Sequence, residues 1–113
     1  MNKLSILLND ELQFEYDRET PPDQGQMDFL NKMDKGMDAS GVILDKEKIK
    51  VPTEEQKTQF VATNLFNAIE AKNGGMIGSM TTYLALRNPK LKQVNFVKKE
   101  GEEVTNKMIY DKA

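Results

Sequence analysis

The segment 52–89 constrains the fold more than any other part of the sequence, because each of its two expected helices has recognisable ends. Thr53 predicts the N-cap of the first helix and Gln56 completes a capping box. Asn73-Gly74 closes this helix, and a second helix is expected over Gly75–Asn88, just before a proline. Apolar residues recur at helical spacing in both. The segment therefore predicts a helical hairpin with a very short connection.

The first segment, Lys3–Asp17, fits two structures. Leu12, Phe14 and Tyr16 alternate with polar residues, as in a half-buried strand. Leucines and the tyrosine also recur every four residues, as on a helix. Asn9-Asp10 is a suitable two-residue hairpin turn, so extended structure is the expectation.

The other elements are predicted from the periodicity of their apolar residues and from the residues that end helices or form turns. A methionine-rich apolar stripe predicts a helix over Gln24–Ala39, ended by Gly41. Val42–Val51 predicts a short strand or tight hairpin around Asp45-Lys46-Glu47, and alternation predicts a hairpin over Leu91–Tyr110. Together these elements predict an α+β fold dominated by helices. In it, three helices pack on a small antiparallel sheet made mainly by the C-terminal hairpin, in one domain spanning residues 1–113.

The expected core consists of the apolar residues that carry the helical periodicity. They are Leu30, Phe60, Leu65, Ile69, Ile77 and Leu84.

The absence of cysteine and histidine excludes the commonest kinds of chemistry. No disulfide framework can form, which favours a reducing compartment such as the cytoplasm. The usual general base, the usual catalytic thiol and the commonest zinc, copper and iron ligands are missing. Carboxylate, lysine and tyrosine chemistry stay open, as do oxygen-ligated cations. No apolar run has a membrane span's roughly 20 residues, and none predicts a secretory signal.

The stretch Gly36–Glu47 partly matches the calcium loop of EF-hands. Gly41, Ile43 and Glu47 fall at the loop's turn, apolar and bidentate positions, and Asp38 and Ser40 fall at ligand positions. Glycine stands where the first position requires aspartate. The favoured interpretation is a helix C-cap that leads into a short strand, and no metal or cofactor is predicted.

Two further features each allow a functional and a structural interpretation. The glycine-rich stretch Asn73–Ser79 precedes a helix but lacks the spacing of phosphate-binding loops, which favours a tight interhelical turn. The carboxylates of Asp34, Asp38, Asp45 and Glu47, or of Glu54 and Glu55, show no sign of converging on a pocket, so no catalytic residue is predicted.

The order helix, short strand, helix, tight turn, helix, hairpin resembles that of winged-helix domains, which bind DNA. The charge distribution is also uneven: residues 1–60 carry 8 basic and 13 acidic side chains, a net charge of −5, and residues 61–113 carry 8 and 5, a net charge of +3. The resemblance implies that Gly75–Asn88 is the recognition helix and that the wing tip lies at Lys98-Lys99. It implies the following DNA-binding residues: Ser79, Thr81, Thr82, Arg87, Lys90, Lys98 and Lys99.

The sequence favours a small non-enzymatic accessory or protein-interaction domain of the bacterial kind, with a winged-helix DNA-binding regulator as the alternative. Seven methionines, five of them on helical faces, predict apolar surface left over for a protein partner or a second copy. The expected places are the methionine stripe of Gln24–Ala39 and the edge of the C-terminal hairpin, and a homodimer is the expected assembly.

Overall fold

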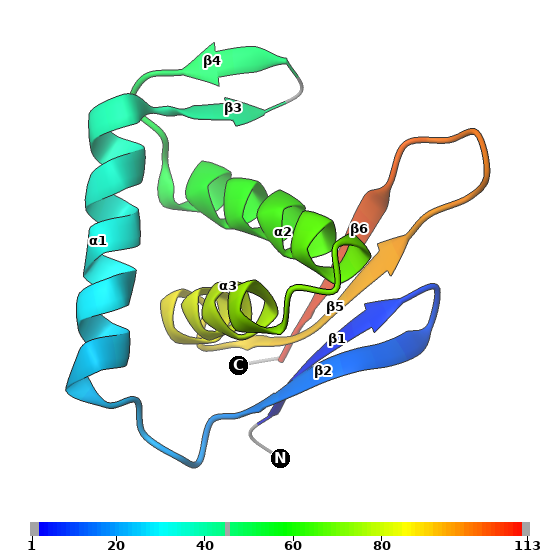
Figure 1. Cartoon of the computed structure of the whole chain (residues 1–113), viewed down its shortest axis with the longest axis horizontal. Helices are drawn as coiled ribbons and strands as arrows, with labels where there is room; N and C mark the ends of the chain where they lie inside the picture. Colours follow the sequence, from blue (N-terminus) through cyan, green and yellow to red (C-terminus); the bar gives the residue numbers. More distant parts are fainter. Residues whose placement is uncertain (1–2, 45, 112–113) are drawn as a thin grey trace.

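A computed structural model describes residues 3–44 and 46–111 (Figure 1). Its elements alternate between short hairpins and helices. In chain order they are β1 (Lys3–Leu8), β2 (Glu11–Asp17), α1 (Gln24–Ser40), β3 (Val42–Leu44), β4 (Glu47–Ile49), α2 (Glu54–Glu70), α3 (Gly74–Arg87), β5 (Leu91–Val97) and β6 (Thr105–Tyr110).

The first segment is a β-hairpin, as the Asn9-Asp10 turn predicted. Both turn residues have positive φ, 49° and 69°, which is the backbone of the two-residue turns that match the twist of paired strands. Strands β1 and β2 pair antiparallel, with Leu4 opposite Tyr16 and Ile6 opposite Phe14. The four-residue recurrence of leucines therefore does not indicate a helix here.

The two terminal hairpins join into one four-stranded sheet of order β2-β1-β5-β6. The two central strands, β1 and β5, are parallel, and each hairpin is antiparallel, so the sheet is mixed where an antiparallel one was expected. The α+β class, the three helices and the C-terminal hairpin are confirmed. The connector between α1 and α2 forms a hairpin, β3–β4, which is a separate sheet. Asp45, which follows β3 in the sequence, lies outside the described residues.

The helix ends follow the capping chemistry in the sequence. Thr53 and Gln56 form the predicted capping box of α2. The backbone N–H of Gln56 donates to Thr53 Oγ1 at 3.1 Å, and the backbone N–H of Thr53 donates to Gln56 Oε1 at 2.9 Å. Gly41 ends α1 at a φ of 73°, and a Cβ there would collide with the backbone carbonyl of Ile49.

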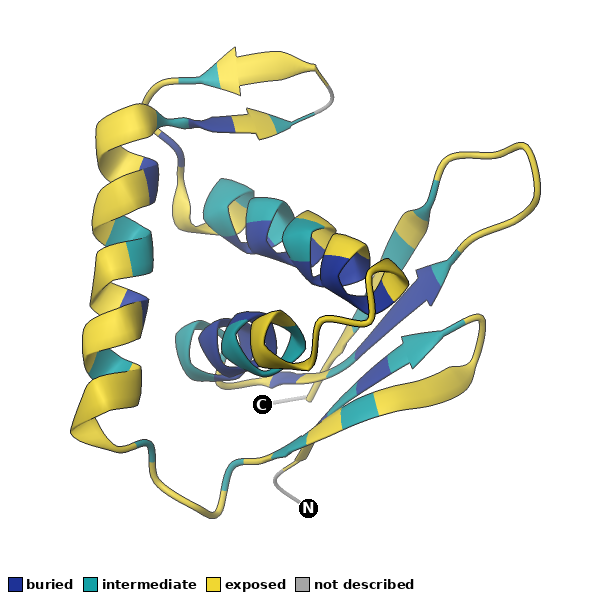
Figure 2. Ribbon diagram, in the orientation of Figure 1, coloured by how far each residue is buried: buried dark blue, intermediate teal, exposed yellow. Residues whose placement is uncertain are grey.

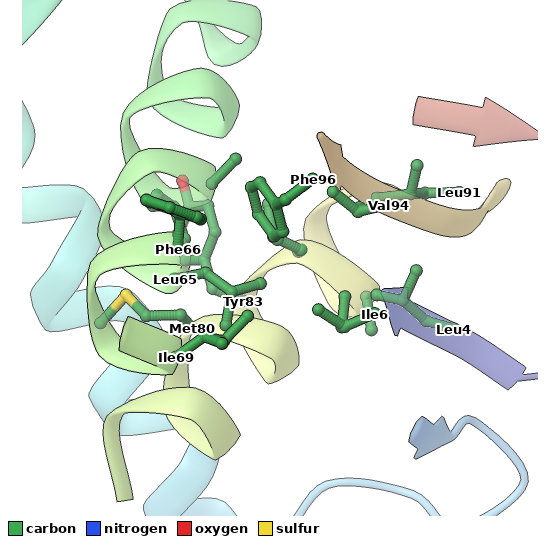
Figure 3. Packing of buried hydrophobic residues seen from close by; sticks show 14 of the residues in the cluster. Leu4, Ile6, Leu65, Phe66, Ile69, Met80, Tyr83, Leu91, Val94 and Phe96 are labelled. Carbon is green, nitrogen blue, oxygen red and sulfur yellow. The ribbon is translucent and has the colours of Figure 1, made fainter. Parts of the chain in front are cut away.

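Helices α2 and α3 cover one face of the sheet, and the core lies between them and strands β1 and β5 (Figure 3). The rings of Phe66 on α2 and Phe96 on β5 pack at a centroid distance of 5.6 Å. Of the predicted core, Leu30, Leu65, Ile69 and Leu84 are buried, whereas Phe60 and Ile77 are only partly buried.

Helix α1 stands beside α2 and α3 and exposes most of its surface (Figure 2). Its methionine stripe faces inward: Met37 is buried, and Met27 and Met33 are half-buried against the core. The expectation that this stripe offers free apolar surface is therefore wrong, because the stripe is the side of α1 that packs on the domain. Within the described ranges, the chain has no helix whose length and apolarity would let it cross a membrane.

Truncating Leu65 to alanine should lower the free energy of unfolding by about 2–5 kcal/mol, because its buried side chain would leave a cavity. Urea unfolding monitored by circular dichroism measures the change. The matched control is Leu12→Ala, since Leu12 is 59% exposed. A loss below about 0.5 kcal/mol for Leu65→Ala would show that the core is wrongly assigned.

Candidate functional site

One cluster of ionisable side chains lies where the three helices meet, around Asp34 of α1. The Tyr83 hydroxyl donates to Asp34 Oδ1 at 2.6 Å, and Arg87 Nε donates to Asp34 Oδ2 at 3.0 Å. Arg87 Nη2 lies 2.9 Å from the same carboxylate oxygen, in an ion pair, and donates to Asn31 Oδ1 at 3.2 Å. Lys57 of α2 places its Nζ 2.8 Å from Asp38 Oδ1 and 3.7 Å from Asp34 Oδ1. These contacts connect the middle of α1 with both other helices.

The cluster lines a cleft of about 600 Å³ together with Glu54 and Glu55 of α2. Four of the carboxylates that showed no sign of converging in the sequence therefore share one cleft. Its cations are already neutralised, because Lys57 and Arg87 pair with the two aspartates of α1. Burial, together with the hydrogen bond to Asp34, holds the pKa of Tyr83 above its ordinary value, so its phenol stays protonated at neutral pH. The arrangement acts as a polar clamp (Asp34, Asp38, Lys57, Tyr83 and Arg87) that holds α1 against the domain.

A second cavity of about 570 Å³, here called the β2 groove, lies between β2, α1 and α3. Small residues of α3 line one side, and aromatic residues of β2 and α1 line the others. The lining residues are Phe14 and Tyr16 of β2, Gly25, Gln26, Phe29 and Leu30 of α1 with its N-cap Asp23, and Gly74, Gly75, Gly78, Ser79 and Thr82 of α3.

The open space in the β2 groove comes from glycine. A Cβ added at Gly78 or at Gly74 would meet no heavy atom within 4 Å. Close packing of Gly78 against a neighbouring element, which a glycine inside a helix suggests, is therefore not what the structure shows. Phe29 is 41% exposed above this space, and Phe14 and Tyr16 are half-buried beside it.

The β2 groove borders an edge of the sheet. Strand β2 pairs with β1 on one side, and the sheet order places its other side at the edge. In an edge strand, backbone N–H and C=O groups of alternate residues point away from the sheet without a strand partner. The groove thus joins apolar walls to a row of backbone donors and acceptors.

The edge is also acidic. Residues 11–23 carry five carboxylates, from Glu11, Glu15, Asp17, Glu19 and Asp23, against one cation, Arg18. The Arg18 guanidinium donates to the backbone carbonyl oxygens of Ala85 and Asn88 at 3.2 and 2.9 Å. It thus supplies hydrogen bonds to carbonyl groups at the C-terminal end of α3, which lack donors within the helix.

The residues expected to bind DNA do not form one surface. Thr81 and Thr82 are buried and donate to carbonyl oxygens one turn earlier, and Arg87 is held by Asp34. Ser79 lines the β2 groove. Lys90 and Lys98-Lys99 are exposed but flank opposite ends of β5, roughly 25 Å apart at about 3.3 Å per residue.

The partial EF-hand match is a helix end followed by a hairpin, as favoured. Asp38 and Ser40 lie on α1 and Glu47 lies on β4. The Asp38 carboxylate forms an ion pair with the Lys57 ammonium. The glycine-rich stretch is the short connection between α2 and α3, followed by the first turns of α3. Sequence reasoning missed both the polar clamp and the β2 groove. The one usable signal was the glycine spacing in α3.

No protein-family model, curated protein or solved structure matches the chain.

Replacing Tyr83 with phenylalanine tests the clamp through pH. The folded state raises the pKa of Tyr83, so its contribution to stability is complete below the unfolded pKa of 10.0 and falls as pH rises above it. At pH 7 the variant should be less stable by about 1.5–3 kcal/mol, the range for a hydrogen bond to a charged group. Above pH 10 this difference should shrink by up to about 1.4 kcal/mol per pH unit. Urea titrations at pH 7 to 11 measure it, and a constant difference would contradict the clamp.

Proposed function

We propose that this chain is a non-enzymatic protein-interaction domain that takes up an extended segment of a partner protein along β2. The observation that carries the proposal is that an apolar groove borders the edge of the sheet that β2 forms. An added strand would bond to the backbone of β2 and place every second side chain in the β2 groove. Backbone bonds would supply affinity, and the groove would supply selectivity.

The non-enzymatic part of the proposal rests on how the polar side chains are used. In the polar clamp, both cations pair with carboxylates and the Tyr83 phenol stays protonated, so the groups are committed to holding α1. Catalytic groups need a free acid, base or nucleophile aimed at a substrate. The contacts of the clamp support a structural role.

The DNA-binding alternative finds less support in these contacts. A recognition helix presents its side chains to the groove of DNA, whereas Thr81 and Thr82 point into the domain and Arg87 is bound to Asp34. Lys90 and the Lys98-Lys99 pair would contact phosphates at separate places. We therefore favour a protein partner.

A second copy of the chain is the other candidate partner, at the opposite edge of the sheet. On strand β6, Ile109 is 41% exposed and Tyr110 is 48% exposed. Strand β6 forms the second edge of the sheet, so one side of its backbone has no neighbouring strand in the sheet order. Pairing of β6 with β6 of another copy would form the homodimer that the hairpin edge predicts. Light scattering at micromolar concentration measures this mass. Because the chain has no cysteine, we place both interactions in the cytoplasm.

Filling the β2 groove tests the proposed function. A displayed library of random peptides is selected on the immobilised wild-type chain, and the affinities of selected peptides are measured by fluorescence anisotropy. Gly78→Leu should weaken them at least tenfold, because its side chain enters the groove. The matched control is Gly36→Leu, at an exposed position of α1 where an added Cβ also meets nothing within 4 Å.

Both substitutions replace a helical glycine, so both should preserve or raise helix stability. Thermal melting checks that each variant is folded. Failure to select any peptide, or selected peptides that bind both variants equally, would contradict the proposal.

A further inference from the structure

We infer that the partner segment is a strand in which basic residues alternate with apolar residues. This inference rests on the proposed function and specifies its partner. It follows from the two different environments that flank the outer edge of β2, one on each face of the sheet.

The groove face of β2 is apolar. Phe14 and Tyr16 lie opposite Ile6 and Leu4 of β1, whose side chains are in the core, so all four side chains share the helix-covered face. Neighbouring side chains on one face of paired strands lie about 4.5–5.5 Å apart at Cβ. A partner strand's residues on this face would contact these two rings and Phe29, and apolar side chains fit there.

The opposite face of β2 carries two carboxylates, Glu15 and Asp17, towards its C-terminal end and the exposed Leu12 towards its N-terminal end. Glu15 lies opposite Ser5, and Asp17 lies opposite Lys3, so both carboxylates lie on the face that the helices leave uncovered. Glu15 makes an exposed ion pair with Lys3 at 3.3 Å, which is a weak interaction in solvent. The partner residues that alternate with the apolar ones would lie beside these carboxylates, where lysine or arginine side chains are complementary.

The same charges disfavour a second copy at this edge. In a two-fold symmetric antiparallel pairing centred at Tyr16, the β2 strands of two copies would place Glu15 of each chain opposite Asp17 of the other. Like charges on adjacent strands are destabilising. On the uncovered face Glu15 and Asp17 outnumber Lys3, and the nearby Arg18 is engaged by carbonyl oxygens of α3, so this edge favours a basic strand over its own copy.

Three synthetic peptides test this chemistry. Each has the same isoleucine and valine residues at alternate positions, a proline at both ends to block self-association, and lysine, glutamine or glutamate at the intervening positions. Isothermal titration with the full chain should give the order lysine, glutamine, glutamate, with the lysine peptide at least tenfold tighter than the glutamate peptide. Raising the salt from 50 to 500 mM should reduce this difference severalfold.

The double variant Glu15→Gln with Asp17→Asn should abolish most of the preference for the lysine peptide. Its matched control is Glu102→Gln with Glu103→Gln, which removes the same charge from exposed positions between β5 and β6. Equal affinities for the lysine and glutamine peptides, both lost in Gly78→Leu, would overturn the charge inference and leave the proposed function standing. Binding of none of the three peptides, together with a failed library selection, would overturn both.

Discussion

The parallel pairing of β1 with β5 is the interaction on which the rest of the structure depends. It joins the first and last hairpins of the chain, and side chains extend it beyond the strands. The Asn9 side chain exchanges two hydrogen bonds with the backbone of Lys98, at 3.1 and 2.9 Å. Asn95 is buried in the sheet, and its side-chain nitrogen donates to Asp10 Oδ1 at 2.7 Å. Its side-chain oxygen accepts a hydrogen bond from the backbone N–H of Asp10. The left-handed turn at Asn9-Asp10 thus closes one hairpin and attaches it to the other. Because both inner positions are taken by β1 and β5, β2 and β6 become the edges.

Helix α1 is held differently, and the groove beside it stays open. It contributes two buried apolar residues, Leu30 and Met37, and two half-buried ones, Met27 and Met33, and the polar clamp around Asp34 adds to this packing. The cavity beside β2 persists because the facing residues of α3 are glycine, serine and threonine. Small residues on α3 therefore account for the space beside β2, whereas the strand order leaves the edge of β2 free.

The elements that sequence reasoning predicted are those with local signals. Thr53 and Gln56 marked a helix start, Asn9-Asp10 marked a turn, and Gly41 marked a helix end, because each requirement lies within a few residues. The parallel β1–β5 pairing joins segments almost 90 residues apart and leaves no local pattern, so an antiparallel sheet was expected. Periodicity placed the methionines on one face of α1 without showing that this face packs inward. The partners of Asp34 come from two other helices, α2 and α3, so only the folded chain brings them together.

The account's central claim is that β2 accepts a partner strand at its outer edge. Nuclear Overhauser effects between the backbone of β2 and the lysine-containing peptide, measured on the isotope-labelled chain, test it most directly. The account predicts close contacts between backbone protons of the peptide and those of Glu11–Asp17, with peptide isoleucine or valine methyls near the rings of Phe14 and Phe29. Contacts confined to β6, or to the uncovered face of the sheet without backbone pairing to β2, would contradict it.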